Sequence, residues 1–382
     1  MDRHDTLNVQ ARALHATDGT AELYLTATPD PRLPLDAQLR ETYAALLEHL
    51  REQGMAVFCE RFFATAKAMD AVLAHRRGLP GVPDDGVAPV ALAVGPGSYG
   101  GFAGVQIHAV RADLRPRPLG RGDGGAPAEG RVIRQGDHTW VHLAGLSADP
   151  DLEEAEQAGQ VFSRAASLLR QVGADMRSVA RTWLWLKDLC GWYDELNAVR
   201  NVFFRCEGLI DEEARSVRLP ASTGIGMYGA GGAAITLDLI AMPGREGEIR
   251  LVEAGGSQES AFEYGSAFSR AAVAPMPGGP TVFISGTAAI DRSGATEHVG
   301  RIEAQIDGTI AHVRSLLAQF GCDDGSVLTA LAYCKTPEVE EVFRERWADL
   351  PWPRITMNGD VCRPELLFEV EVTAAPAGVR PL

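Results

Sequence analysis

The chain has 382 residues, of which 46% are hydrophobic and 23% are charged, and its formal net charge is -15. This balance excludes a disordered chain and provides enough apolar side chains for two or three hydrophobic cores. So large a negative charge argues against nucleic acid and anionic membranes as partners. A small anionic ligand would need a pocket that is locally basic.

The N-terminal segment and the cysteines indicate the compartment. Residues 1–10 include Asp2, Arg3, His4 and Asp5 and are followed by no apolar run, so we expect no signal peptide. No uninterrupted apolar stretch approaches the roughly 18 residues that a membrane helix needs. The six cysteines are scattered, with no CxxC pair and no histidine at ligand spacing from two of them. We therefore predict a cytoplasmic protein without disulfides or a bound metal.

One order of elements occurs three times along the chain, at a period of roughly 125 residues: strand, long helix, strand, shorter helix, strand. In the first copy, residue alternation predicts a strand over 22–28 and apolar residues at helical spacing predict a helix over 35–52. Residues 56–64 and 104–110 are further predicted strands of this copy.

The second and third copies follow the same order more clearly. The second has predicted strands at 139–147, 179–186 and 233–242, and predicted helices at 151–171 and 193–204. The third has predicted strands at 281–289, 327–334 and 366–373, and predicted helices at 299–320 and 338–347. Gly321 stands just after the long helix of the third copy, where a glycine typically ends a helix.

Composition places the boundaries between the copies. Residues 114–130 are rich in proline, glycine and arginine, which is typical of a linker. We predict an N-terminal degenerate unit over 1–113, this linker, a second unit over 131–256 and a C-terminal unit over 257–382. Units of this kind bury one sheet face under helices, and three of them can close around a shared axis. The predicted fold is therefore an α+β intrachain pseudo-trimer; the alternative is three unrelated α+β domains.

The last strand of each copy differs at one aligned position. That position holds Gln106, Thr236 and Glu369, so a carboxyl group stands there in the third copy alone. Glu369 and Glu371 share one face of their strand because strand side chains alternate. On an enclosed face the pKa of such a carboxyl group rises, which suits a general acid. The alternative is that both glutamates pair with arginines or water on an exposed face.

Seven short motifs make the chain recognisable. They are FISGTA at 283–288, FEVE at 368–371, LNAVRN at 196–201, LPASTGIG at 219–226, YG at 264–265, FSRA at 268–271 and VCRPELL at 361–367. The first two are similar to strands of the Rid (YjgF) superfamily, and the others to the chorismatases, which release pyruvate from chorismate. The resemblance implies three tandem Rid/YjgF-like (chorismate-mutase-like) units, of which the first matches only weakly.

The chorismatase resemblance implies an acid and a set of binding groups. Chorismate is a dianion with an enol ether, and a neutral carboxylic acid must protonate its enolpyruvyl methylene carbon. Glu369 matches the family's acid, seven residues after the cysteine matched by Cys362. The implied substrate-binding residues are Arg200, Arg270, Tyr193, Tyr264, Thr223, Gly224 and Ala288, with Arg354 and Arg363 as further cations.

Four of these residues have a structural alternative. Arg200 could be solvated on its helix, Arg270 could hold the linker between copies, and Gly224 could serve a tight turn. Cys362 could be a small buried apolar residue, although the resemblance puts it beside the substrate ring, where we hypothesise that it steers the product.

The sequence leaves the product open. Cys362 favours 3-hydroxybenzoate (or 4-hydroxybenzoate), whereas alanine at Ala288 favours hydrolysis to a dihydroxycyclohexadiene carboxylate. Tyr333, Cys334 and Lys335 stand where an arginine-ended strand is expected, which leaves room for a changed substrate. A secondary-metabolite pathway is what the resemblance implies.

Two other functions remain open. One is a Rid-type enamine or imine hydrolase, because Arg354 stands fifteen residues before Glu369, as in that family's carboxylate-binding arginine and its partner glutamate. The other is a non-catalytic ligand-binding module. The glycine-rich runs at 95–101 and 229–232 do not open a helix after a strand, so we expect no nucleotide cofactor. The chain would act as a monomeric pseudo-trimer or as a higher homo-oligomer.

Overall fold

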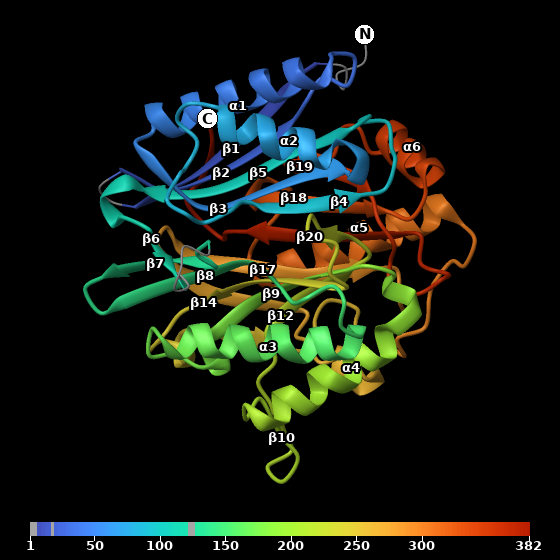
Figure 1. Ribbon diagram of the computed structural model, residues 1–382. Helices are drawn as coiled ribbons and strands as arrows, with labels where there is room; N and C mark the ends of the chain where they lie inside the picture. The colour runs from blue at the N-terminus through green and yellow to red at the C-terminus, as the bar shows by residue number, and fades with distance from the viewer. Residues whose placement is uncertain (1–5, 17–18, 121–126) are drawn as a thin grey trace.

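The computed structural model describes residues 6–16, 19–120 and 127–382. In this part of the chain, three large sheets of seven, six and six strands face one another, and helices cover their outer sides (Figure 1). Each large sheet belongs mainly to one copy of the repeated unit. The predicted fold class, three tandem α+β units in an intrachain pseudo-trimer, is confirmed.

The first unit shows the topology that all three share. Its elements are β1 (Asn8–Ala16), β2 (Gly19–Thr28), α1 (Leu35–Glu52), β3 (Met55–Thr65), α2 (Ala66–Gly78), β4 (Val90–Val94) and β5 (Phe102–Arg111). The last strand, β5, is inserted between β2 and β3 and is antiparallel to both. The short strand β4 pairs in parallel with β3. The spatial order is thus β4-β3-β5-β2-β1.

The second and third units repeat this order. The second contains β7 (Gly130–Gln135), β8 (His138–Ser147), α3 (Glu154–Arg170), β9 (Val179–Leu186), α4 (Leu189–Cys206), β12 (Ala221–Ile225) and β14 (Ile235–Ala241). The third contains β16 (Ala271–Met276), β17 (Gly279–Ala288), α5 (Ile302–Gln319), β18 (Val327–Cys334), α6 (Pro337–Arg346), β19 (Arg354–Asn358) and β20 (Phe368–Ala374). Their sheets are ordered β12-β9-β14-β8-β7 and β19-β18-β20-β17-β16.

The predicted elements agree with the observed ones to within a few residues. Helix α1 and strands β9 and β18 begin and end where they were predicted. Gly321 has a left-handed φ of 68°, as the end of α5 requires. Helix α2, the first strand of each unit and the parallel edge strand of each unit were not predicted. The edge strands β4, β12 and β19 have five residues each, too few to show a period.

Short strands cross between the units. β13 (Tyr228–Gly229), which follows β12 in the chain, pairs with β4 of the first unit. The C-terminal strand β21 (Val379–Pro381) pairs with β1 (Figure 1). β15 (Arg250–Val252) pairs with β16, and β6 (Arg117–Leu119), inside the predicted linker, pairs with β7. The predicted unit boundaries stay a prediction, but the units are interlocked at their edges. The hairpin of β10 (Ile210–Asp211) and β11 (Ser216–Val217) stands apart.

A shared core lies where the three sheets meet. Each unit has an outer core between its sheet and its helices, and a further cluster joins inward-facing side chains of all three units. Phe63 of β3 meets Trp185 of β9 edge to face, with ring centroids 6.4 Å apart, and both side chains are fully buried. Tyr333 of β18 belongs to the same cluster. Burial of these large rings is the main stabilising contribution at the centre.

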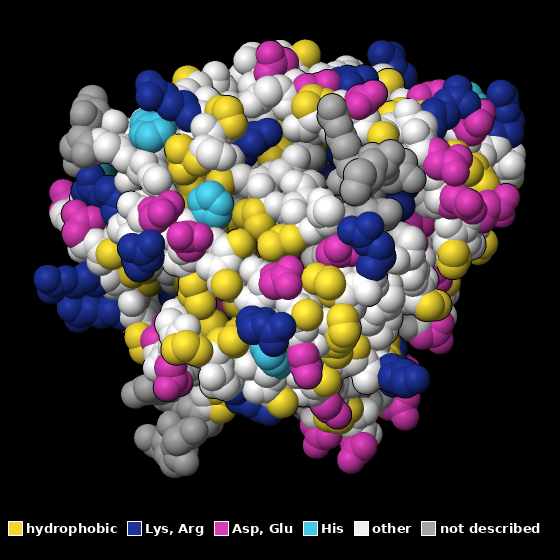
Figure 2. All heavy atoms as spheres, turned by 90° about the horizontal axis from the view of Figure 1, so that it is seen from above, with side chains coloured by type: hydrophobic (Ala, Val, Ile, Leu, Met, Phe, Trp, Pro, Cys, Tyr) yellow, Lys and Arg dark blue, Asp and Glu magenta, His cyan; other side chains and the backbone are white. Residues whose placement is uncertain are grey.

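The outer face above α1 and α2 is a mixed surface. Figure 2 shows acidic, basic and hydrophobic side chains interspersed over it. No helix within the described residues has the length and apolarity needed to cross a bilayer.

The shared core predicts cooperative loss of stability. Phe63→Ala removes a ring that links the first unit to the second, so the free energy of unfolding should fall by about 3–5 kcal/mol. Urea unfolding followed by both circular dichroism and tryptophan fluorescence should show one transition at a lower midpoint. Val202→Ala, at a side chain that is 59% exposed, is the control and should change little. Two separated transitions, only one of them shifted, would contradict a shared core.

Candidate active site

One pocket lies between the second and third units. Five segments form its wall: helix α4, strand β12, the segment that precedes β16, strand β17, and the loop and strand around β20. Its lining residues are Tyr193, Arg200, Ser222, Gly224, Tyr264, Ser266, Phe268, Arg270, Gly286, Ala288, Ile290, Cys362, Arg363, Leu366 and Glu369. Nine of the eleven residues singled out in the sequence therefore line one pocket. Their roles stay predictions.

The two glutamates of β20 have different surroundings. The Glu371 carboxylate accepts a hydrogen bond from Arg181 Nη2 at 2.7 Å and one from Trp183 Nε1 at 2.7 Å. The Glu369 carboxyl group lines the pocket, and no hydrogen bond to it is found within the described residues. Burial, and after it the charge of Glu371, raises the pKa of Glu369, while Arg181 and Arg270 oppose the rise, and together these effects place the pKa at about 8. Glu369 is thus suited to donate a proton near neutral pH.

A glycine makes room for the Glu369 carboxyl group. The pairing of β17 with β20 shifts register between Ile284 and Thr287, which places Gly286 in a bulge. A Cβ atom on Gly286 would collide with Glu369 Oε1. The Gly286 N–H donates to Thr223 Oγ1 at 3.0 Å, so β12 of the second unit holds the bulge of the third. The site needs glycine here because the carboxyl group occupies the side-chain position.

The pocket contains arginines without acidic partners. Arg200 and Arg270 are almost completely buried, and Arg363 is half-buried. Arg200 Nη2 donates to Asn197 Oδ1 at 2.6 Å, and its Nε has no acceptor in the described parts of the chain. Burial lowers the pKa of Arg200, and the nearby Tyr193 opposes this. None of the three forms an ion pair with a carboxylate of the described residues, so the pocket is locally basic in an acidic protein.

Tyr264 connects two of these cations. Its hydroxyl group accepts a hydrogen bond from Arg270 Nη2, and the Arg270 Nε donates to the Glu259 carbonyl at 3.0 Å. The guanidinium carbons of Arg270 and Arg363 both lie 5.5 Å from the centroid of the Tyr264 ring. Burial raises the pKa of Tyr264. The arrangement holds both guanidinium groups at the pocket without using a carboxylate.

The other predicted residues occupy the remaining walls. Tyr193, on the same face of α4 as Arg200, lies 3.5 Å from Ser266 Oγ, and burial raises its pKa to about 12. Burial, with Glu369 next in effect, raises the pKa of Cys362 to about 12, so its thiol stays protonated. Ala288 is the β17 partner of Glu369. Thr223 lies just behind the wall, where it accepts from Gly286 and Arg181.

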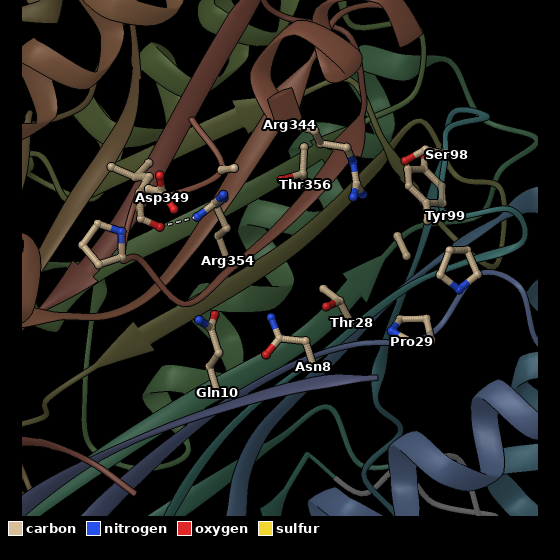
Figure 3. Close-up of a pocket in the computed structure, with 15 residues that line it drawn as sticks. Asn8, Gln10, Thr28, Pro29, Ser98, Tyr99, Arg344, Asp349, Arg354 and Thr356 are labelled. Carbon is tan, nitrogen blue, oxygen red and sulfur yellow. Dashed lines mark hydrogen bonds between the residues drawn. The ribbon is translucent and has the colours of Figure 1, made fainter. Parts of the chain in front are cut away.

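Arg354 lies at a different interface. It lines a cavity of ≈ 330 Å³ between the third and first units, with Arg344, Asp349, Gln10 and Thr28 (Figure 3). Its guanidinium group donates to the backbone carbonyls of residues 347, 350 and 352. Burial, and to a lesser extent Arg344, lowers its pKa to about 10. The edge strand β19 contacts β2 and β5, so it directs Arg354 toward the first unit and not toward Glu369.

The sequence analysis left out several residues of the site. Gly286 lies within a quoted motif, and its signal was the glycine in an otherwise apolar strand. Arg181 stands in the run VARTWLWL, where a lone arginine in a buried strand signals a polar partner on another element. The hydroxyl of Ser285 links three segments, because it accepts from the Ser222 N–H at 2.8 Å and donates to the Ser269 carbonyl at 2.6 Å.

The raised pKa of Glu369 predicts a pH-dependent stability. The folded chain keeps this carboxyl group protonated up to about pH 8, whereas in the unfolded chain it ionises near the ordinary 4.5. Stability is therefore lost as the pH rises from 4.5 to 8, at about 1.4 kcal/mol per pH unit at most. Glu369→Gln should be more stable than the wild type at pH 8 and lose this advantage toward pH 4.5.

Urea unfolding across this range measures the difference. Glu365→Gln, at an exposed position of the preceding loop, is the matched control and should track the wild type. A gap between Glu369→Gln and the wild type that is equal at every pH would show that the folded protein does not hold the proton.

The comparisons with known proteins concern the fold. No protein-family model matches the chain, and no curated protein matches it. The crystal structure of a chorismatase is similar with a TM-score of 0.61, over 84% of this chain and 93% of that chain, at 20% identity. A Rid-family protein from Yersinia pestis and a YjgF-family protein from Neisseria meningitidis have TM-scores of 0.28 and 0.26 and identities of 18% and 20%. They cover 33% and 34% of this chain, and 98% and 95% of their own. The chain has the fold of chorismatase.

Proposed function

We propose that the chain is a chorismatase, an enzyme in which Glu369 protonates the enolpyruvyl ether of chorismate and pyruvate is released. One observation carries the proposal: a carboxyl group with a pKa of about 8 faces a pocket together with three arginines that form no ion pair with a carboxylate of the described residues. A neutral acid among unpaired cations fits a substrate that is a dianion and must be protonated on carbon.

The arginines supply the basis for substrate binding. A buried charge without a partner is costly, by several kcal/mol for a broken buried pair. The two carboxylates of chorismate would provide the missing partners for Arg200 and Arg270, and guanidinium groups bind carboxylates through two parallel hydrogen bonds. Arg363, at the half-buried side of the pocket, would screen the charge during entry. The net charge of -15 makes this local basic pocket necessary.

The proposed reaction starts with proton transfer from Glu369 to the enolpyruvyl methylene carbon. Positive charge then develops at the ether carbon, beside the newly formed Glu369 carboxylate, which stabilises it. If water adds, chorismate and water give pyruvate and a dihydroxycyclohexadiene carboxylate. Without net uptake of water, one of the two oxygens bound to the ring leaves with pyruvate, the other stays on the ring, and a ring proton is lost as the ring becomes aromatic, so the products are pyruvate and a hydroxybenzoate. Cys362 and Ala288 line the pocket and are the residues we propose to select the branch.

Substrate entry requires part of the wall to move. The free volume of the pocket is ≈ 50 Å³, whereas sites for small organic ligands usually enclose about 300–1,000 Å³. The least regular wall is the segment before β16, which contains only a short 3-10 turn at Ala261–Tyr264 within the described structure. We propose that this segment and the Arg363 side chain open and then close over the substrate.

The two alternative functions have less support. An imine hydrolase of the Rid type would need Arg354 and Glu369 in one site, but Arg354 lines the cavity between the third and first units. A module that only binds a ligand gives no reason for a carboxyl group held protonated beside the cations.

Pyruvate release tests the proposal directly. Wild-type protein with chorismate should release pyruvate, measured through lactate dehydrogenase, and mass spectrometry of the aromatic product identifies the branch. Glu369→Gln should lower kcat by about 10²–10⁴-fold, because it removes the acid without changing the shape of the side chain. Equal rates in the two proteins, or no pyruvate from the wild type, would contradict the proposal.

The arginines can be tested separately. Arg270→Lys keeps the charge but loses the planar fork, so KM for chorismate should rise about 10-fold or more while the protein stays folded. Arg354→Ala should keep pyruvate release, since Arg354 lies outside the pocket. If the wild type instead hydrolyses 2-iminobutyrate, and Arg354→Ala abolishes this hydrolysis while Arg270→Lys retains it, an imine hydrolase is favoured.

A further inference from the structure

A buried ion pair crosses from the second unit to the third directly behind Glu369. Arg181 lies on β9, its side chain is almost fully enclosed, and its Nη2 donates to Glu371 Oε2 at 2.7 Å. Trp183, two residues further along β9, donates its indole N–H to the other oxygen of Glu371 at 2.7 Å. The Arg181 guanidinium carbon also lies 4.6 Å from the Trp183 ring centroid. Both oxygens of Glu371 are therefore held by the neighbouring unit.

The same arginine reaches the floor of the pocket. Arg181 Nη2 also donates to Thr223 Oγ1, and Thr223 Oγ1 accepts from the N–H of Gly286. Gly286 is the residue whose missing Cβ leaves room for the Glu369 carboxyl group. Movement of Arg181 would thus move the surface on which that carboxyl group lies.

The charges around Glu369 are unbalanced without Glu371. The titratable and charged groups that interact with Glu369 are Glu371 on β20, Tyr333 on β18, Arg181 on β9, Arg270 before β16, Tyr193 on α4 and Cys362 before β20. Arg181 and Arg270 are the cations among them. Arg181 Nη1 is buried and has no acceptor within the described residues. Glu371 and Glu369 are the carboxyl groups that interact with Arg181, so if Glu371 did not take up the charge of Arg181, the anion of Glu369 would be stabilised.

We propose that Arg181 and Glu371 are positioning residues: Glu371 occupies Arg181 as a counter-ion, so that Glu369 stays neutral and is held over Gly286 to donate its proton. This inference rests on the proposed function. It assigns a role in the reaction to an ion pair that otherwise only joins two units. Trp183 supports this arrangement because its N–H binds the second Glu371 oxygen and keeps the carboxylate turned away from the pocket.

The chain contains a second buried ion pair between units. Arg61 of β3 pairs with Asp238 of β14 at 2.7 Å, across the interface between the first and second units. Asp238 stands two residues after Thr236, as Glu371 stands two residues after Glu369, and Thr236 and Glu369 lie opposite the seventh residues of β9 and β18. The Arg61 pair also joins two units, but Arg61 stacks on the Trp183 ring at 3.8 Å and interacts with Glu371, so it is not independent of Arg181 and Glu371. The control for the loss of a buried pair alone is Glu60→Gln, which breaks the buried ion pair of Glu60 with Arg76 inside the first unit.

The test is the pH dependence of kcat/KM for pyruvate release. Activity needs protonated Glu369, so it falls as the pH rises through the pKa of Glu369. Glu371→Gln leaves Arg181 unpaired beside Glu369 and should move this alkaline limb to lower pH by about one unit or more, with activity recovered on acidification. Arg181→Gln leaves two carboxyl groups without the cation and should move the limb to higher pH. The double variant should return toward the wild type, and Glu60→Gln, which breaks a buried pair inside the first unit, should not move the limb.

Opposite shifts in the two single variants are the result that a purely structural pair does not produce. Unshifted limbs, or shifts in one direction in both, would overturn the inference. If the neutral variants do not fold, Arg181→Lys decides: it keeps the charge, so the limb should stay, but it loses the fork that holds Glu371 and Thr223, so kcat should fall at least 10-fold. An unchanged kcat in that variant would also overturn the inference.

The inference can fail separately from the proposed function. If the wild type releases no pyruvate, the function is wrong, yet the Glu369 carboxyl group can still be titrated by ¹³C NMR in the wild type and the same variants. Opposite displacements of its pKa in Glu371→Gln and Arg181→Gln would then support the counter-ion role of Glu371 without any assay of turnover.

Discussion

The candidate site depends on the closure of three sheets around one apolar core. A single unit of this topology covers one face of its sheet with helices and leaves the other face, with side chains such as Phe63, Trp185 and Tyr333, open to water. Burial of those faces against one another holds the units in fixed positions. Only then can Glu369 of the third unit meet Arg200 of the second in one pocket. The free energy gained by burying the apolar centre thus offsets the cost of burying the charged groups at its edge.

The three interfaces have a common plan but different contents. The last strand of each unit contains the aligned position, which holds Gln106, Thr236 and Glu369. These residues pair with the seventh residues of β3, β9 and β18, which are Arg61, Trp185 and Tyr333. At the interface between the first and second units, β13 approaches Thr236 so closely that a Cβ on Gly229 would lie 2.5 Å from the hydroxyl oxygen of Thr236. At the interface between the third and first units, the Gln106 amide donates to the backbone carbonyl of Ala330 at 2.8 Å. At the aligned position, one interface thus presents a titratable group to a ligand, whereas the other two interfaces use this position for packing and backbone contacts.

The sequence could predict the features that follow from local residue patterns. It could not predict those that depend on contacts between residues far apart in the chain. The helix at 35–52 and the strands at 179–186 and 327–334 have strong apolar patterns, so their bounds were predictable. The aligned acid position was predictable because the units repeat. That Glu371 is held in an ion pair while Glu369 faces the pocket was not predictable, because it depends on Arg181, which comes from another unit and is 190 residues from Glu371 in the chain. Arg354 was predicted as a further cation of the site, but it lines the cavity between the third and first units; a strand's sequence does not tell which neighbouring unit its edge will face.

The geometry explains how an acid stays neutral among cations. Arg181 is directed to Glu371, and Arg270 to Tyr264 and a backbone carbonyl, so neither guanidinium group donates a hydrogen bond to Glu369. Burial then outweighs their more distant attraction and keeps the proton on Glu369. A dianionic substrate would strengthen this balance, because its carboxylates would neutralise Arg200 and Arg270 and add negative charge near Glu369. Glu369 would then keep its proton until it transfers the proton to the substrate carbon. Binding of the dianion would thus itself keep the acid protonated for the reaction.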